Sequence, residues 1–194
     1  SEIGVNILKK GGNAADATIA VQFALAVVYP SAGNIGGGGF FVYRENNGHC
    51  SALDFREKAP LMASPDMYLD SNNNVVKDLS LYSHLAVGVP GTVDGMVNIH
   101  NKYGQLPWVE LVQPAIDLAG NGFELTKREA DKLNRFNKRN NTNNNISEYY
   151  KDHYLEGDSI FLPQLSTTLT QIRDFKRSGF YKGEVAQLLV NEMK

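Results

Sequence analysis

The residues that decide the fold are SAGNIGGGG at positions 31–39, a segment that ends in four consecutive glycines. An apolar, alanine-rich stretch with helical character precedes it at residues 14–29, and the β-rich run FFVYR follows it at residues 40–44. The NNG sequence at residues 46–48 is a hairpin signal, so residues 49–55 are predicted to form a second strand. The sequence therefore predicts a buried helix, a glycine-rich connection and a β-hairpin, in that order.

The glycine run has a conformational cost, since each glycine loses about 0.5–1 kcal/mol more backbone entropy on folding than alanine does. Such a run indicates a place where side chains would obstruct something. A phosphate-binding loop is excluded because neither common phosphate motif occurs in the run. Those motifs also follow a strand and open a helix, whereas this run follows a helix and opens a strand. We predict that the glycines allow close backbone approach beside a functional site.

Cap and stop signals place the remaining helices. A short helix is predicted within residues 1–10, stopped by Gly11 and Gly12, and Asn13 is expected to cap the next helix at the amide of Asp16. Pro30 ends that second helix. Further helices are predicted at residues 93–103, 107–118 with a kink at Pro114, 126–138 as an exposed basic helix, 163–176 and 180–193. The asparagine-rich residues 140–145 are predicted to form a polar loop.

Composition indicates one domain, or a large piece of one, over residues 1–194. The formal net charge is 19 − 21 = −2, which gives no long-range attraction to nucleic acid or to an acidic membrane. The apolar stretch at residues 14–29 is interrupted by polar residues and is too short for a membrane span. Cys50 is alone, expected to be half-buried in a strand, and can form neither an internal disulfide nor a cysteine-based zinc site. The four histidines show no ligand spacing, so no metal site is predicted.

The charged segment DFREKAP at residues 54–60 ends the predicted second strand. The guanidinium of Arg56 offers a planar fork that matches two carboxylate oxygens, as recognition of an amino-acid head group requires. The alternative is an internal ion pair with Asp54 or Glu57, and the spacing alone favours that alternative. Asp54 and Arg56 would then share one face of the strand.

No catalytic nucleophile is evident. Thr167 and Thr168 are candidates, because a threonine at a new N-terminus can attack with its own amine as base. They lie within a predicted amphipathic helix, where a nucleophile has no room to attack. Neither a Ser-His-Asp order nor a G-x-S-x-G elbow occurs.

Taken together, several long motifs resemble γ-glutamyltransferases. The resemblance rests on these stretches, in the family's order: GGNAADA at 11–17, AGNIGGGGF at 32–40, DFREKAP at 54–60, PGTVDG at 90–95, YG at 103–104, QPA at 113–115 and FYKG at 180–183. It covers nearly the whole chain.

The resemblance implies an N-terminal nucleophile hydrolase with an αββα sandwich (α/β, or α+β), of which this chain would be a helix-rich portion with a β-hairpin. The family is made as a precursor that cleaves itself into a large and a small subunit, and the chain looks like the N-terminal portion of the large subunit. The family reaction cleaves glutathione and other γ-glutamyl compounds and transfers the γ-glutamyl group to water, an amino acid or a peptide. The nucleophile is a threonine of the small subunit, so no catalytic residue is expected in this chain.

Of the family's substrate-binding residues, Arg56 alone maps here, where it would hold the α-carboxylate of the γ-glutamyl group. The resemblance implies no metal and no organic cofactor. It implies the small subunit and a γ-glutamyl substrate as partners, and a periplasmic or extracellular location, although Ser1-Glu2-Ile3-Gly4 does not begin a signal peptide. Two alternatives stay open: a non-catalytic binding module on the same scaffold, and a related acylase acting on cephalosporins or poly-γ-glutamate.

Overall fold

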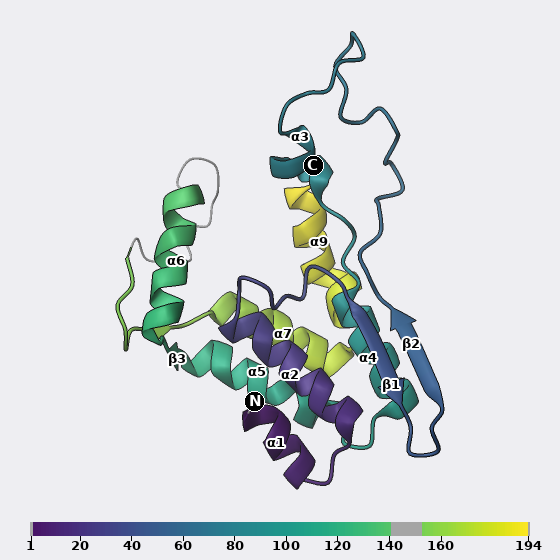
Figure 1. Cartoon of the computed structure of the whole chain (residues 1–194), viewed down its shortest axis with the longest axis vertical. Helices are drawn as coiled ribbons and strands as arrows, with labels where there is room; N and C mark the ends of the chain where they lie inside the picture. The colour runs from purple at the N-terminus through teal and green to yellow at the C-terminus, as the bar shows by residue number, and fades with distance from the viewer. Residues whose placement is uncertain (1, 141–152, 194) are drawn as a thin grey trace.

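The computed structural model describes residues 2–140 and 153–193 (Figure 1). The helices have these bounds: α1 Glu2–Lys9, α2 Ala14–Val28, α3 Leu79–Tyr82, the 3₁₀ turn η1 His84–Ala86, α4 Thr92–Tyr103, α5 Trp108–Asn121, α6 Lys127–Asn140, α7 Pro163–Phe175, α8 Ser178–Tyr181 and α9 Gly183–Glu192. The strands are β1 Phe40–Arg44, β2 Cys50–Asp54, β3 Phe123–Glu124 and β4 Ser159–Ile160. The predicted polar loop at residues 140–145 lies outside the described residues, apart from Asn140 at the end of α6.

The core is a layer of helices in which α5 packs against both α2 and α7 (Figure 1). Phe23 of α2 meets the edge of the Trp108 ring of α5, with ring centroids 5.7 Å apart. The indole Nε1 of Trp108 donates a 3.0 Å hydrogen bond to the carbonyl of Ile172 on α7. The apolar side chains on the facing sides of these helices include several that are fully buried: Ile19, Val27, Leu111, Val112, Ala115 and Leu169. As the alanine-rich composition predicted, α2 is buried along most of its length.

The start of α2 is fixed by a capping box. The side-chain oxygen of Asn13 accepts hydrogen bonds from the amides of Ala15 and Asp16, and the Asp16 carboxylate accepts from the amide of Asn13. The cap predicted at Asn13 is therefore confirmed. Asp16 is fully buried and also accepts from the amides of Gln105 and Leu106, which precede α5. One carboxylate thus joins the beginning of α2 to the connection between α4 and α5.

Strands β1 and β2 form the predicted antiparallel hairpin, with Phe40 opposite Asp54 and Arg44 opposite Cys50. Alternate side chains face opposite sides of it. Phe41 and Tyr43 stack at 5.6 Å and pack on Tyr103 of α4, so this face belongs to the core. The other face carries the exposed Phe40 and Val42. Cys50 is exposed rather than half-buried, since it lies at the end of β2 beside the hairpin turn.

The C-terminal helix prediction is partly wrong. Residues 180–193 are not one helix, because α8 ends at Tyr181 and α9 begins at Gly183, whose φ of 68° lies in the left-handed region that favours glycine. The helix expected at 107–118 continues through Pro114 and Gly120 as far as Asn121, and Gly122 ends it with φ 82°.

The basic helix α6 is less exposed than predicted. Ala130 on its inner face is buried in a small second core with Leu125, Tyr154 and Ile160. The strand pair β3–β4 belongs to this unit, which lies on the opposite side of the helical layer from the hairpin (Figure 1). Two short strands that sequence analysis did not predict therefore join α6 to the rest of the chain.

Substitution of Asp16 tests the link between α2 and the 105–106 connection. In the complete protein, Asp16→Ala is expected to lower the free energy of unfolding by about 3 kcal/mol, because buried amides lose their acceptor. Urea unfolding monitored by circular dichroism measures the change. The matched control is Thr18→Ala on the exposed face of the same helix, which is expected to stay within about 0.5 kcal/mol of wild type. Equal effects of the two variants would contradict the role given to Asp16.

Candidate functional site

Arg56 lies just beyond the end of β2, held in place through its backbone. The Phe55 amide donates to the carbonyl of Gly39 at 3.0 Å, which extends the hairpin by one residue. The next amide, that of Arg56, donates to Oδ1 of Asp54 at 2.9 Å. Lys58 then pairs with Val89 through two backbone hydrogen bonds. The chain thus leaves the hairpin along a defined path on both sides of Arg56.

Gly38 of the glycine run packs closely against the backbone at Arg56. A Cβ atom on Gly38 would lie 2.5 Å from the Cα of Arg56, 2.5 Å from the carbonyl oxygen of Phe55 and 2.7 Å from the nitrogen of Glu57. Real Cβ atoms do not approach this closely, so only glycine fits at position 38. The predicted close backbone approach is confirmed, and its partner is the segment that carries Arg56.

A second set of glycines encloses the same segment from the start of α4. A Cβ on Gly91 would collide with the carbonyl oxygen of Phe55, and one on Gly95 would collide with the Phe55 ring. Sequence analysis quoted these glycines within a longer motif but assigned them no role. Their spacing of four residues, which places both on one face of a helix start, was the available signal.

Hydrogen bonds tie the two glycine segments together. The amides of Gly91 and Thr92 both donate to the carbonyl of Gly37, at 2.7 and 3.0 Å. Oδ1 of Asn34 accepts from the Gly37 amide at 2.8 Å and from the hydroxyl of the buried Thr92 at 3.0 Å. Asn34 is therefore the side chain that joins the glycine run to α4.

The start of α4 is also anchored from the opposite side, by α8. Burial raises the pKa of the Tyr181 hydroxyl, which donates to the carbonyl of Pro90 at 2.8 Å and accepts from the amide of Asp94. Nε of Arg177 donates a 2.6 Å hydrogen bond to the Asp94 carboxylate in an ion pair. The loop that packs on Arg56 is thus fixed on two sides.

The guanidinium of Arg56 is exposed, and its central carbon lies 5.6 Å from the centroid of the Phe40 ring, within cation–π distance. Within residues 2–140 and 153–193, no carboxylate forms an ion pair with it. The internal ion pair with Asp54 or Glu57 is therefore absent from the described residues. Arg56 lies beyond the end of β2, but its guanidinium lies over the ring of Phe40, the cross-strand partner of Asp54, and therefore on the same side of the hairpin as Asp54.

The threonine pair of α7 makes local hydrogen bonds within the helix. Thr167 is exposed and Thr168 is half-buried, and their hydroxyls donate to the carbonyls of Pro163 and Gln164 one turn back, as expected of helix threonines. No group of three or more metal-ligating side chains is found in the described parts of the chain.

Comparison with known proteins agrees with this architecture. The whole chain, residues 1–194, matches the family described as Gamma-glutamyltranspeptidase. The chain belongs to the gamma-glutamyltranspeptidase family. The glutathione hydrolase proenzyme of Pseudomonas sp. (strain A14) is 47% identical over 198 residues, which cover 100% of this chain and 34% of that protein. The chain therefore spans about a third of the length of that curated relative.

The crystal structure of Helicobacter pylori gamma-glutamyltranspeptidase has the same fold, with a TM-score of 0.94 and 47% identity over 99% of this chain and 56% of that chain. A cephalosporin acylase from Bacillus halodurans, at 24% identity and a TM-score of 0.84, shares the fold alone. The fold class expected from the sequence, a helix-rich portion of the N-terminal nucleophile hydrolase fold with a β-hairpin, is confirmed. In this gamma-glutamyltranspeptidase chain, two of the motifs that carry the family resemblance, at residues 32–40 and 90–95, supply the glycines that enclose the backbone at Arg56.

The glycine contacts predict a sharp difference between two neighbouring substitutions in the complete protein. Gly38→Ala is expected to lower the free energy of unfolding by about 2 kcal/mol, because the new methyl group forces the 55–57 backbone aside. Gly36→Ala is the matched control, since nothing lies within 4 Å of a Cβ at that position. Thermal unfolding of both variants measures the effect. Equal stability of the two would show that Gly38 does not constrain the Arg56 segment.

Proposed function

We propose that this chain is the N-terminal portion of the large subunit of an enzyme that cleaves glutathione and other γ-glutamyl compounds. Two observations support the proposal: the family match over residues 1–194 and the glutathione hydrolase relatives that the chain covers in about one third of their length. Residues 1–194 would be one partial domain, since a single main core runs from Ile7 on α1 to Phe180 on α8. The cephalosporin-acylase alternative has no comparable support, because the likeness to that acylase is one of fold alone.

Arg56 is assigned to the α-carboxylate of the γ-glutamyl group. The single observation that carries this assignment is that its guanidinium is exposed and without an ion pair in the described residues, while its backbone is fixed between Gly38 and Gly91. A fixed backbone with a free guanidinium offers a preformed fork for a carboxylate. The hydrogen bonds form without reorganising the chain, so the donor is held in one orientation.

The chemistry is supplied from outside this chain. A threonine at the N-terminus of the small subunit attacks the γ-carbonyl carbon, and its own amine takes the hydroxyl proton. The threonine ammonium then gives this proton to the leaving nitrogen as the C–N bond breaks, which releases the amine and leaves a γ-glutamyl ester on the threonine. Water or the amine of an acceptor then attacks the ester, and the threonine hydroxyl is restored. Arg56 holds the donor through these steps and does not touch the reacting atoms.

The remaining parts of the proposal concern partner and compartment. The relatives named as proenzymes support a precursor that is processed into two subunits, so we assign the small subunit as the partner of this chain. We assign a periplasmic or extracellular location by family likeness. In the described residues, no helix has the length and apolar character needed to cross a membrane.

Removing the charge at Arg56 tests the assignment in the processed enzyme. Arg56→Gln is expected to raise the donor KM by about 10- to 100-fold with little change in kcat, because loss of charge-assisted hydrogen bonds costs about 1.5–3 kcal/mol. Arg44→Gln, at the other end of the same hairpin, is the matched control and should leave KM unchanged.

A donor without the α-carboxylate makes the test specific. We compare a γ-glutamyl anilide with the 4-aminobutyryl anilide, which lacks only that group. Wild-type enzyme is expected to prefer the γ-glutamyl anilide strongly, and Arg56→Gln should lose most of that preference. If Arg56→Gln kept the full preference, Arg56 would not be the group that binds the carboxylate.

Phe40 is expected to act as a positioning residue for Arg56. Phe40→Leu removes the ring beneath the guanidinium and should raise the donor KM by about two- to fivefold at unchanged kcat, since an exposed cation–π contact contributes about 0.5–1 kcal/mol. Phe40→Tyr keeps the ring and should restore the wild-type KM. Val42→Ala, on the same exposed face of β1, serves as the control. A KM in Phe40→Leu equal to that of the control would contradict the role of the ring.

A further inference from the structure

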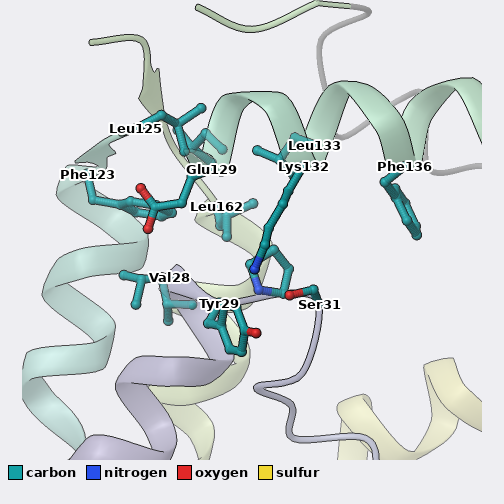
Figure 2. A pocket seen from close by; sticks show the side chains of 13 residues that line it. Val28, Tyr29, Ser31, Phe123, Leu125, Glu129, Lys132, Leu133, Phe136 and Leu162 are labelled. Atoms are coloured by element: carbon teal, nitrogen blue, oxygen red, sulfur yellow. The ribbon is translucent and has the colours of Figure 1, made fainter. Parts of the chain in front are cut away.

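A pocket away from Arg56 lies between the end of α2 and helix α6 (Figure 2). Its volume is about 250 Å³, slightly below the range of about 300–1,000 Å³ that is usual for drug-sized ligands. None of the residues that line it belongs to the glycine run, to β2 or to the start of α4. It is therefore separate from the substrate site proposed above, and it fits a small molecule.

The walls of the pocket are almost wholly apolar. They come from three elements that pack around it: the end of α2, the β3–β4 pair with its flanking residues, and α6, with Val28, Phe123, Leu125, Leu133 and Leu162 among the lining residues. The polar side chains of the lining are Tyr29, Ser31, Glu129 and Lys132, and the remaining lining side chains are apolar. The interior therefore suits a hydrocarbon or aromatic group.

One end of the pocket carries a positive charge. The Lys132 ammonium lies 4.7 Å from the centroid of the Tyr29 ring, and Figure 2 shows it beside Tyr29 and Ser31. Hydrogen bonds from Ser31 and Lys132 to the phenol oxygen lower the pKa of Tyr29, and the charge of Arg128 adds to this effect. Lys132 forms no ion pair with a carboxylate of residues 2–140 or 153–193. Lys132 as a residue is half-buried, and an ammonium group without a carboxylate partner is complementary to an anion.

The nearby carboxylate of Glu129 does not neutralise Lys132. One of its oxygens, Oε2, accepts hydrogen bonds from the amide of Thr126 at 2.8 Å and from its hydroxyl at 2.6 Å, as part of the N-terminal cap of α6. Figure 2 shows this carboxylate beside Phe123, away from the Lys132 ammonium. An anionic group would be repelled from the Glu129 side and attracted to the Lys132 side. The two charges therefore determine the orientation of a bound anionic ligand.

We propose that this pocket binds a small apolar monocarboxylate, with its hydrocarbon part between Val28, Phe123 and Leu133 and its carboxylate on Lys132. The Tyr29 hydroxyl lies at the same end and can donate to the second carboxylate oxygen. Apolar burial supplies the affinity and the ammonium supplies the preference for an anion.

Isothermal titration of the complete protein with octanoate, octanol and octylamine tests the proposal, since these probes share one chain and differ in head-group charge. Octanoate is expected to bind at least tenfold more tightly than octylamine. In Lys132→Met, which keeps the apolar stem, octanoate should lose at least tenfold in affinity while octanol is unchanged. Lys127→Met, at the exposed start of the same helix and outside the pocket, should behave as wild type.

A second variant separates pocket binding from adsorption elsewhere. Leu133→Trp fills the pocket and should abolish binding of both octanoate and octanol, while a thermal melt verifies that the variant is folded. The proposal is overturned if octanoate does not bind the complete wild-type protein, if Lys132→Met binds it as tightly as Lys127→Met does, or if folded Leu133→Trp still binds it. Arg56→Gln should leave octanoate affinity unchanged, which keeps this outcome independent of the proposed function.

Discussion

The close packing of glycines against the backbone of residues 55–57 is the constraint on which the proposed site depends. Gly38 on one side and Gly91 on the other approach atoms of this backbone more closely than any side chain would permit. Asn34 holds the two glycine segments together through Gly37 and Thr92. Ordering these glycines on folding costs backbone entropy. Their close packing makes the backbone beneath the Arg56 guanidinium rigid. Rigidity in the backbone, rather than an ion pair on the side chain, fixes Arg56.

The helical layer supports the hairpin and the glycine segments that pack around Arg56. The hairpin that ends at Asp54 rests with one face on α4, and the start of α4 is held by Tyr181 and Arg177 of the C-terminal region. Residues more than eighty positions apart in the chain therefore meet beside Arg56. The hairpin and the small unit around α6 lie on opposite sides of this layer (Figure 1).

The features that were predicted correctly from the sequence are those that depend on residues close together in the chain. The Asn13 cap, the burial of α2 and the hairpin turn at residues 46–48 follow from short-range signals and are confirmed. The close backbone approach of the glycine run was predicted, but the matching role of Gly91 and Gly95 was not, because their four-residue spacing does not say which distant segment they pack against. The break before Gly183 and the exposure of Cys50 were missed because both depend on what packs nearby. Arg56 was predicted as a carboxylate ligand by resemblance, since spacing alone favoured an ion pair.

The central claim is that Arg56 presents a preformed fork to the α-carboxylate of a γ-glutamyl group. A crystal structure of the complete, processed protein with bound L-glutamate tests it most directly. The account predicts that guanidinium nitrogens of Arg56 lie about 2.7–2.9 Å from the α-carboxylate oxygens, with the 55–57 backbone still packed between Gly38 and Gly91. An α-carboxylate bound by other residues, with Arg56 paired to a carboxylate of the protein, would contradict it.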